Sequence, residues 1–428
     1  MKPVKVGLLG LGTVGTGVVR IVEGHQEDLQ NQAGSPIHVE KILVQNKAKA
    51  RSLTIDESKL TEDPWDIIAD PEIDVIVEVM GGVEHTRTYL LEAIARGKSI
   101  VTANKDLMAL HGPEILEAAK NNGCDVLYEA SVAGGIPIIR TLIEGFSSDR
   151  IIKIMGIVNG TTNYILTKMS QEGASYDDVL KEAQQLGYAE ADPTSDVEGL
   201  DAARKMTILS TLGFRTNVAL DDVSVQGISS VSKEDILYAK RLGYEVKLLG
   251  IAECQDDQIS VSVQPTMVKQ SHPIASVNGV FNAVYVHGEA VGETMFYGAG
   301  AGELPTATSV VSDLVAVIKN KKLGVAGRQG AMVYKEKKLK TDDQISSKYF
   351  ILLHVDDRAG VLARITQVFA EYEVSLESVL QQPNPNIPEA EIIIITHDAS
   401  KAAVQQVLRS FESLETVRRI KSVYRVEG

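Results

Sequence analysis

The sequence predicts an α/β protein with a doubly wound, Rossmann-like nucleotide-binding domain in its N-terminal part. A short apolar run at 4–9 ends in a glycine turn and is followed by a helix face at 18–22. Further apolar runs alternate with helical patterns over about 130 residues, which is typical of a parallel sheet covered by helices. A charged run at 335–347 then separates this body from residues 349–428.

Composition limits the function classes. The chain has 428 residues, enough for two or three domains, and its 44% hydrophobic and 23% charged residues are ordinary for a soluble enzyme. A net charge of -14 argues against nucleic acid and anionic membranes as partners. No run of about 18 apolar residues predicts a membrane span. The two cysteines, Cys124 and Cys254, provide neither a disulfide framework nor a thiolate metal cluster, so we expect a cytoplasmic protein.

The elements of the first domain follow from apolar runs and helical spacing. Strands are expected at 4–9, 39–44, 74–79, 99–101 and 126–128, with helices at 86–96 and 113–121.

Beyond residue 134 the pattern changes to a second, α+β domain. It is expected to contain a strand at 150–158, helices at 163–171 and 176–186, and β-rich alternation over 246–291. Glycines at 298–302 then lead into an apolar helix through Ile318 that returns the chain to the first domain.

The last part of the chain predicts a small ferredoxin-like domain in the order βαββαβ. Its elements are expected at 349–355, 361–372, 374–381 and 390–396, with a helix from 400 and a strand at 417–424. We therefore place the nucleotide-binding domain at 1–130 plus 305–325 and the substrate and dimerisation domain at 131–304. A linker at 331–348 and the small domain at 349–428 complete the division.

Three glycines lie between the first predicted strand and the first predicted helix. Gly10 permits the tight turn, Gly12 lets the backbone approach a pyrophosphate, and Gly15 allows close helix packing. The motif follows a strand and precedes a helix, the context that dinucleotide binding requires.

The choice between NAD and NADP depends on the end of the second strand. Gln45 and Asn46 stand where an acid would bind the ribose diol of NAD. Lys47, Lys49 or Arg51 could pair with the 2′-phosphate of NADP, or could simply occupy an exposed turn. We favour NADP, with NAD tolerated.

Carboxylates crowd a Gly- and Pro-punctuated loop that runs into a helix. Glu190, Asp192 and Asp196 precede that helix, and Asp201 and Lys205 stand four residues apart on one of its faces. The cluster suits a polar, zwitterionic substrate. An acidic helix start with one Asp–Lys pair is the alternative.

Three other polar segments follow strands. Lys105, after the strand at 99–101, could meet the reaction site or be a surface lysine. The segment 129–137 joins a carboxylate to glycine-bent backbone, which fits a domain hinge or a hard cation. The segment 159–163 supplies caps and free N–H groups for oxygen ligands, although helix capping alone would also explain it.

These motifs together resemble homoserine dehydrogenase in the version with a C-terminal ACT domain, over essentially the whole chain. The residues that carry the resemblance are Gly10-Leu11-Gly12-Thr13-Val14-Gly15, Thr102-Ala103-Asn104-Lys105, Asn159-Gly160-Thr161-Thr162-Asn163, the block 190–205, and 298–302 with Pro305-Thr306-Ala307.

The resemblance implies reversible hydride transfer between NAD(P)H and L-aspartate 4-semialdehyde, giving L-homoserine on the route to threonine, methionine and isoleucine. It implies that Lys205 protonates the carbonyl oxygen and that Glu190 and Asp201 hold the substrate. Lys105 would lie at the junction of cofactor and substrate, and Asp196 would be a supporting acid.

The resemblance also implies the ligand sets. The cofactor would contact Gly10, Gly12, Thr13, Val14, Gly15, Lys105, Gly187 and Gly302. A structural sodium ion would take the Glu129 carboxylate with the carbonyls of Val132, Gly134 and Ile136.

The turn at 356–363 resembles the ACT signature, which binds an amino acid between paired domains. Asp357, Ala359, Gly360 and Val361 would contact the effector, with L-threonine the ligand that fits the pathway. Alternatively, the domain only assists oligomerisation. The family pattern implies a homodimer, or a homotetramer through ACT pairing.

Two other functions would also fit parts of the sequence. Aspartate-semialdehyde dehydrogenase needs an activated cysteine nucleophile, and neither Cys124 nor Cys254 has a histidine or helix N-terminus nearby in the sequence. A non-catalytic amino-acid sensor on a dehydrogenase scaffold is the other alternative, and the presence of Lys205, Glu190 and Asp201 argues against it.

Overall fold

The computed structural model describes residues 2–328, 333–383 and 389–428. The chain divides into two compact units. Unit 1 comprises Met1–Val158, Arg204–Asp221 and Phe281–Lys337, and unit 2 comprises Asn159–Ala203, Asp222–Val280 and Lys338–Gly428. The division follows packing, so the boundaries predicted above for the functional domains stay predictions. Residues 331 and 332 of the predicted linker lie outside the described residues.

Unit 1 is built on a parallel six-stranded sheet in the order β3-β2-β1-β4-β5-β6. The strands are β1 (Val4–Leu9), β2 (Ile37–Leu43), β3 (Leu60–Thr61), β4 (Val75–Glu78), β5 (Ser99–Thr102) and β6 (Val126–Leu127). β1 lies between β2 and β4, so the order reverses at the end of β1, where doubly wound sheets bind ligands. The predicted parallel, doubly wound sheet is confirmed.

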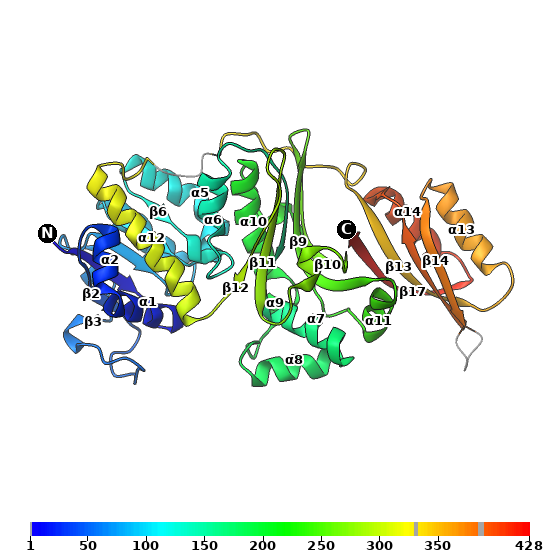
Figure 1. Ribbon diagram of the computed structural model, residues 1–428, viewed down its shortest axis with the longest axis horizontal. Helices are drawn as coiled ribbons and strands as arrows, with labels where there is room; N and C mark the ends of the chain where they lie inside the picture. Colours follow the sequence, from blue (N-terminus) through cyan, green and yellow to red (C-terminus); the bar gives the residue numbers. More distant parts are fainter. Residues whose placement is uncertain (1, 329–332, 384–388) are drawn as a thin grey trace. The chain divides into compact units, whose positions relative to one another are not determined.

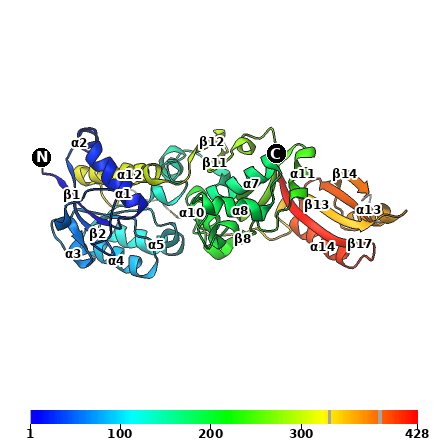
Figure 2. The same ribbon diagram turned by 90° about the horizontal axis from the view of Figure 1, so that it is seen from below.

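Helices cover both faces of this sheet. Figure 2 shows α1 (Thr13–Gly24), α2 (Gln26–Ala33) and α12 (Glu303–Leu323) on one side, and α3 (Trp65–Ile68), α4 (Glu84–Ala95) and α5 (Lys105–Asn121) on the other. Figure 1 shows the long α12 running beside α1. Gly17 permits this approach, because a Cβ there would lie 2.6 Å from the carbonyl oxygen of Glu303.

One helix of this domain is longer than the sequence predicted. The helix expected at 113–121 begins at Lys105, because the Asn104 side chain accepts a hydrogen bond from the backbone N–H of Leu107 and caps it. Pro113 lies inside the helix. The proline suggested a helix start, whereas the capping residue nine positions earlier marks the true one.

The remainder of unit 1 forms an antiparallel group of three strands and the turns beside it. β11 (Phe281–Gly288) pairs with β12 (Gly292–Ala299) on one side and with β7 (Ile151–Ile157) on the other. The connecting turns and helices are η2 (Glu129–Ser131), α6 (Ile138–Arg140) and η3 (Thr141–Gly145). Helix α10 (Leu200–Phe214) begins in unit 2 and continues in unit 1.

Unit 2 begins with α7 (Gly160–Glu172), α8 (Tyr176–Gln185) and the short α9 (Thr194–Val197), and then takes the first residues of α10. β9 (Tyr244–Gln255) and β10 (Gln258–Lys269) form a long antiparallel hairpin, and β8 (Val223–Val225) pairs with β10. Helix α11 (Lys233–Arg241) precedes the hairpin and carries a capping box formed by Ser232 and Asp235.

The end of the chain folds in the predicted βαββαβ order. Its main elements are β13 (Ser346–Asp356), α13 (Val361–Glu371), β14 (Leu376–Pro383), β15 (Glu389–Thr396), α14 (Lys401–Glu412) and β17 (Val417–Glu427), with the short β16 (Ala399–Ser400) beside β13. Buried side chains of α13 and α14, among them Phe369 and Phe411, pack on one face of this sheet. The ferredoxin-like prediction is confirmed.

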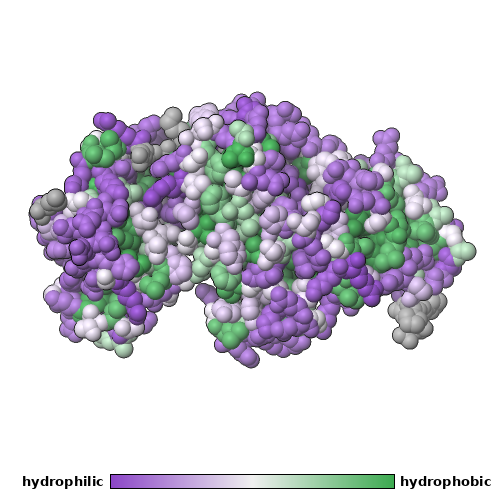
Figure 3. Space-filling model, viewed as in Figure 1, coloured by the Kyte–Doolittle hydropathy of each residue, from purple (hydrophilic) through white to green (hydrophobic). Residues whose placement is uncertain are grey.

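The sheet of this small domain continues into the body of unit 2, because β17 pairs in parallel with β10 and antiparallel with β13. Helix α11 packs on the opposite face of this sheet from α13 and α14. There the buried Asp235 carboxylate accepts hydrogen bonds from the hydroxyls of Ser422 and Tyr424 (2.9 Å from the latter). Hydrophobic residues also gather over this sheet in the space-filling view (Figure 3). The sequence did not predict α11 or this contact.

Across the described ranges, no helix combines the length and the apolar character needed to cross a bilayer.

Candidate active site

The glycine turn after β1 has the geometry that a dinucleotide needs. Gly10 has φ +105°, and a Cβ there would meet the backbone of Met80 at 2.8 Å. A Cβ on Gly15 would lie 2.2 Å from the carbonyl oxygen of Gly10, so only glycine allows α1 to start this close to the turn. Nothing lies within 4 Å of a Cβ on Gly12, which leaves open space for a phosphate group. Thr13 and Val14 form the first residues of α1.

A buried acid orders the neighbouring loop. Glu78, the last residue of β4, accepts hydrogen bonds from the backbone N–H groups of Met80 (2.9 Å) and Gly81 (3.0 Å) and from the Thr102 hydroxyl. Its complete burial raises the pKa of the Glu78 carboxyl. Sequence reasoning missed Glu78, although an acid that closes an apolar strand is a visible signal.

The turn after β2 holds the three basic residues considered for NADP. Arg51 donates to the backbone carbonyls of Asn46, Lys47 (2.9 Å) and Lys49 (2.8 Å), so its guanidinium folds over the turn. The backbone N–H of Lys47 donates to the Glu62 carboxylate at 2.8 Å. These contacts fit both interpretations of the turn, as a site for a 2′-phosphate and as an exposed basic turn.

Lys105 is the first residue of α5, directly after the cap that Asn104 provides. The Asn104 amide also donates to the carbonyl of Gly82 at 2.7 Å, which joins the loops after β4 and β5. The next residue, Asp106, forms an ion pair with Arg204 of α10 (2.7 Å). Lys105 therefore lies at the carboxyl end of the sheet, on the same edge as the glycine turn.

Asn159 joins two of the predicted acids. Its side-chain oxygen accepts the backbone N–H of Thr162 (2.9 Å) and caps α7. Its side-chain nitrogen donates to the carboxylates of Asp196 (2.7 Å) and Asp201 (2.9 Å). Asp201 is only 5% exposed and Asn159 is buried as well, so the amide fixes both carboxylates in place. The sequence indicated a cap at this position but not this bridge.

Lys205 follows Asp201 by one turn of α10, as the four-residue spacing predicted. The helix itself is shared, because Asp201 belongs to unit 2 and Lys205 to unit 1. The Lys205 ammonium donates to the backbone carbonyl of Val158 at 2.7 Å, just beyond the end of β7. The lysine is half-buried and anchored at the end of a strand.

Glu190 and Gly187 lie on the loop between α8 and α9, and both are exposed. Gly187 has φ +75°, a conformation that favours glycine. The Thr161 hydroxyl donates to the carbonyl of Tyr188 (2.6 Å), so the first turn of α7 also holds this loop. The Asp192 carboxylate accepts hydrogen bonds from the backbone N–H (3.1 Å) and the hydroxyl (2.6 Å) of Thr194, the first residue of α9.

The segment after β6 holds the four residues of the predicted ion site. The Glu129 carboxylate accepts backbone N–H groups from Ile139 (2.7 Å) and Arg140 (2.8 Å), and burial raises its pKa. Val132 and Ile136 are buried in the turn between Glu129 and Ile139. The carbonyl of Gly134 accepts the Ser309 hydroxyl at 2.7 Å, and Gly134 has φ +50°.

A second buried acid lies beside this turn. Asp313 of α12 accepts the backbone N–H of Glu129 and the Arg140 guanidinium, each at 2.7 Å. Burial nevertheless raises the pKa of Asp313 to about 7, and the neighbouring Glu129 carboxylate adds to the shift. In the described part of the chain, no three His, Cys, Asp or Glu side chains gather as metal ligands. A cation here would therefore depend on backbone carbonyls.

The glycine-rich segment 298–302 lies against this turn. The backbone N–H of Gly135 donates to the carbonyl of Ala299 at 3.0 Å, and a Cβ on Gly134 would lie 2.4 Å from the carbonyl oxygen of Gly300. Gly302 has φ +130° and is the N-cap residue before α12. Glycine is required here both for close approach and for the backbone conformation.

The turn proposed for an effector lies between β13 and α13. Gly360 has φ +89° and precedes Val361, the first residue of α13. Asp357 and Ala359 lie in the same turn, which is exposed except for Val361. Neighbouring Asp356 forms an ion pair with Arg418 at 2.6 Å, so the turn is tied to β17.

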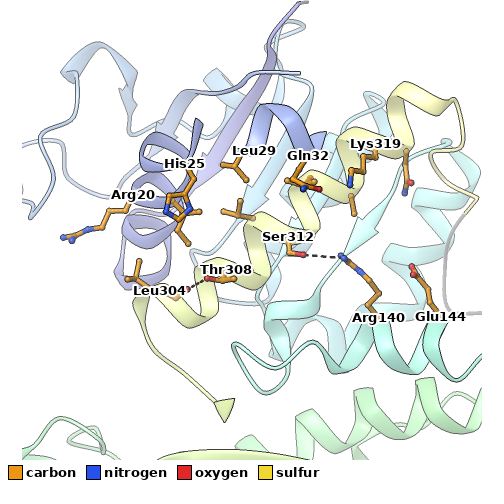
Figure 4. Close-up of a pocket in the computed structure, with 15 residues that line it drawn as sticks. Arg20, His25, Leu29, Gln32, Arg140, Glu144, Leu304, Thr308, Ser312 and Lys319 are labelled. Atoms are coloured by element: carbon orange, nitrogen blue, oxygen red, sulfur yellow. Dashed lines mark hydrogen bonds between the residues drawn. The ribbon is translucent and has the colours of Figure 1, made fainter. Parts of the chain in front are cut away.

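A groove of about 770 Å³ on unit 1 contains none of the predicted site residues. Figure 4 shows Arg20, His25 and Lys319 around it, with Ser312 hydrogen-bonded to Arg140 at 3.4 Å. α1, α2 and α12 supply most of its lining, away from the glycine turn.

Both cysteines are free thiols. Cys124 is buried, and burial raises the pKa of its thiol, which disfavours the thiolate that a nucleophile requires. For Cys124, this agrees with the rejection of a thioester mechanism.

Three family models match the chain. Residues 10–129 match the homoserine dehydrogenase NAD-binding domain, 137–315 match homoserine dehydrogenase, and 349–416 match the ACT domain. Homoserine dehydrogenase of Bacillus subtilis is 57% identical over 100% of this chain and 99% of its own length, and that of Neisseria gonorrhoeae is 40% identical over 100% and 99%.

Solved structures agree. The homoserine dehydrogenase of Thiobacillus denitrificans has a TM-score of 0.93 and 42% identity, covering 100% of this chain and 98% of that one. A hyperthermophilic archaeal homoserine dehydrogenase in complex with NADPH has a TM-score of 0.64 and 25% identity, covering 77% of this chain and 100% of that one. The chain therefore belongs to the homoserine dehydrogenase family of NAD(P)-dependent oxidoreductases, in the version that carries an ACT domain.

Proposed function

We propose that this chain interconverts L-aspartate 4-semialdehyde and L-homoserine by hydride transfer with NADPH or NADH. One observation carries the proposal beyond family membership. Asn159 binds Asp196 of α9 and Asp201 in the first turn of α10, and Lys205 follows Asp201 one helical turn later. An acid that suits a substrate ammonium and a lysine that suits a reacting oxygen thus occupy one helix, and the Asn159 amide holds a second acid beside the first. The non-catalytic sensor is not favoured, because the relatives that match over their full length are named as the enzyme.

Lys205 is the proposed general acid and base. Addition of hydride to the aldehyde carbon breaks the C=O π bond and leaves negative charge on the oxygen. An ammonium in hydrogen-bond reach stabilises that charge and donates the proton that completes the alcohol. In the reverse direction the same amine accepts the hydroxyl proton while hydride leaves the carbon. The contact with the Val158 carbonyl supports this role, because it fixes the amine at the end of β7.

The other site residues follow from charge. Glu190 and Asp201 would bind the substrate ammonium, and Asp196 would support them through Asn159. Lys105, on the sheet edge that carries the glycine turn, would sit at the junction of nucleotide and substrate. The nicotinamide cofactor supplies the hydride when bound, with its pyrophosphate at Gly10, Gly12, Thr13, Val14 and Gly15, and with Gly187 and Gly302 as further backbone contacts.

We favour NADP over NAD. Lys47, Lys49 and Arg51 give the turn after β2 a positive charge that attracts a 2′-phosphate. The turn itself contains no acid, and the Glu62 carboxylate beside it binds the backbone N–H of Lys47. The NADPH bound by the archaeal relative supports this direction.

A sodium ion at the turn after β6 would be held by the Glu129 carboxylate and the carbonyls of Val132, Gly134 and Ile136. The residues fit such an ion, because successive left-handed conformations at Ala133 (φ 56°) and Gly134 (φ 50°) reorient the backbone beside a buried carboxylate. Its chemistry would be structural charge compensation.

The ACT domain would bind L-threonine at Asp357, Ala359, Gly360 and Val361 and inhibit the enzyme. A homodimer or homotetramer in the cytoplasm is the expected working form. The effector proposal rests on the exposed glycine turn before α13 and on the ACT match.

The test follows absorbance of the reduced nicotinamide with L-homoserine and either NAD or NADP, with and without L-threonine. Reduction of the cofactor is expected, faster with NADP and slowed by L-threonine. Absence of reduction with both cofactors would contradict the proposed function.

A further inference from the structure

A lysine lies wholly inside unit 2, away from the acids of the site. Lys247 on β9 is 2% exposed and is one of the largest fully buried side chains described. Its ammonium donates to the Val277 carbonyl (2.6 Å), the Asn278 side-chain oxygen (3.0 Å) and the Asn163 side-chain oxygen (3.4 Å). Three N–H donors thus meet three neutral oxygens.

This arrangement is unfavourable as simple core packing. Burial lowers the pKa of Lys247 to about 8, and Glu245 on the same strand only partly opposes the shift. An apolar side chain of similar length would fill the space without placing a charge in the interior. The contacts that the ammonium makes must therefore account for its presence.

Those contacts hold the segment 277–280 along α7. The Asn163 amide donates to the carbonyls of Val277 (3.2 Å) and Gly279 (3.0 Å), and the Thr167 hydroxyl accepts the backbone N–H of Gly279 at 3.1 Å. A Cβ on Gly160 would lie 2.8 Å from the Val280 carbonyl oxygen. The segment therefore contacts α7 from its first residue to its second turn.

The same first turn of α7 holds the acids. Asn159 binds Asp196 and Asp201, and Thr161 binds the carbonyl of Tyr188 in the loop that carries Glu190. Every residue in this chain of contacts, from Lys247 to Asp201, belongs to unit 2. The nucleotide turn belongs to unit 1.

We propose that Lys247 is a positioning residue for substrate binding. It fastens the segment 277–280 to α7, and the first turn of α7 in turn sets the carboxylates that receive the substrate ammonium. The inference rests on the proposed function and extends it to a residue remote from the reacting atoms. Its effect is confined to the amino-acid half of the site.

Lys247→Met tests this role, with Lys269→Met as the matched control because Lys269 is an exposed lysine on the partner strand β10. We expect the KM for L-homoserine to rise about tenfold in Lys247→Met, with kcat changed less. The dissociation constant of NADP, measured by fluorescence titration without substrate, should stay within about twofold of the wild type. A homoserine KM equal to that of the control would overturn the proposal, and so would an equal loss of NADP affinity.

Asn278→Ala provides a second variant, because Asn278 is exposed and its loss removes one acceptor of the ammonium without burying anything new. We expect a homoserine KM about threefold above the wild type, again with NADP affinity retained. If Lys247→Met does not fold, this variant decides, and an unchanged KM would reject the role of Lys247. Wild-type protein that does not turn over L-homoserine would instead contradict the proposed function itself.

Discussion

The side-chain nitrogen of Asn159 lies 2.9 Å from the carboxylate of Asp201 and connects the start of α7 to the first turn of α10. The same nitrogen binds Asp196 at 2.7 Å, so one amide holds two acids that would otherwise repel each other. The amide fixes the geometry that a substrate ammonium would meet.

Replacing Asn159 with Ala should lower kcat/KM for L-homoserine by about 10- to 100-fold, because both carboxylates lose a buried donor. Steady-state kinetics with L-homoserine measures this. Asn31→Ala, at an exposed position on α2, serves as the control and should be neutral. Equal kinetics in the two variants would show that Asn159 only caps α7.

Lys205→Ala should reduce kcat by about 10²- to 10⁴-fold, the usual contribution of a positioned acid or base. NADP binding should persist, since the glycine turn is untouched, and fluorescence titration would check it. Lys181→Ala, at an exposed site on α8, should leave turnover unchanged. Near wild-type kcat in Lys205→Ala would remove this lysine from the mechanism.

Gly12→Ala should weaken NADP binding about tenfold without harming the fold. A Cβ at Gly12 enters open space, so nothing in the protein resists it, but it occupies the position that a phosphate would approach. Gly24→Ala, also without neighbours within 4 Å, is the control at the end of α1. Thermal melts and NADP titrations of both variants separate folding from binding.

Asp313 should make stability depend on pH. Its pKa lies at about 7 in the fold against 3.8 for the unfolded reference, so the folded state binds the extra proton between those values. The contribution of Asp313 to the free energy of unfolding is therefore smallest at neutral pH, and Tm should fall as pH rises from about 4 to about 7. Burial raises the pKa of Glu129 as well, which acts in the same direction.

Asp313→Asn should flatten this fall in Tm while retaining an acceptor for the backbone N–H of Glu129. Differential scanning calorimetry between pH 4 and 7 measures the slope. Asp177→Asn, an exposed acid on α8, should keep the wild-type slope. An unaltered slope in Asp313→Asn would assign the pH dependence to other groups.

Asp235→Asn should destabilise unit 2 by about 1–3 kcal/mol, because a buried acceptor of four hydrogen bonds gains a misplaced donor. Urea unfolding monitored by tyrosine fluorescence would measure the loss. Glu234→Gln, the neighbouring residue in the first turn of α11, is the comparison. A midpoint no lower than that of Glu234→Gln would argue that the contact between α11 and β17 is dispensable.

Local signals predicted the fold well. The apolar run at 4–9 predicted β1, and the three glycines after it predicted the turn and the start of α1. Both signals come from residues that are adjacent in the sequence. Helix boundaries predicted from a single proline were less accurate. Pro113 suggested that the helix starts at 113, whereas it begins at Lys105, directly after the Asn104 cap.

The site residues could be nominated from the sequence but not connected. The spacing of Asp201 and Lys205 predicted a shared helix face, yet the bridge from Asn159 spans 42 residues and depends on tertiary packing. Lys247 carried no signal at all, because a single lysine in a β-rich run reads as a solvent-facing position. Its burial becomes visible only when 277–280 folds back along α7.

The place of β17 in its sheet has a consequence for biosynthesis. This strand lies between β10 and β13, so the hairpin made earlier and the small domain made later share a boundary that only residues 417–427 can fill. While the ribosome still holds those residues, β10 lacks its partner at Thr266, Met267 and Val268, and this part of its edge is open to other chains. Unit 2 therefore completes its sheet only after β17 has emerged from the ribosome, and chaperone protection of that edge would matter until then.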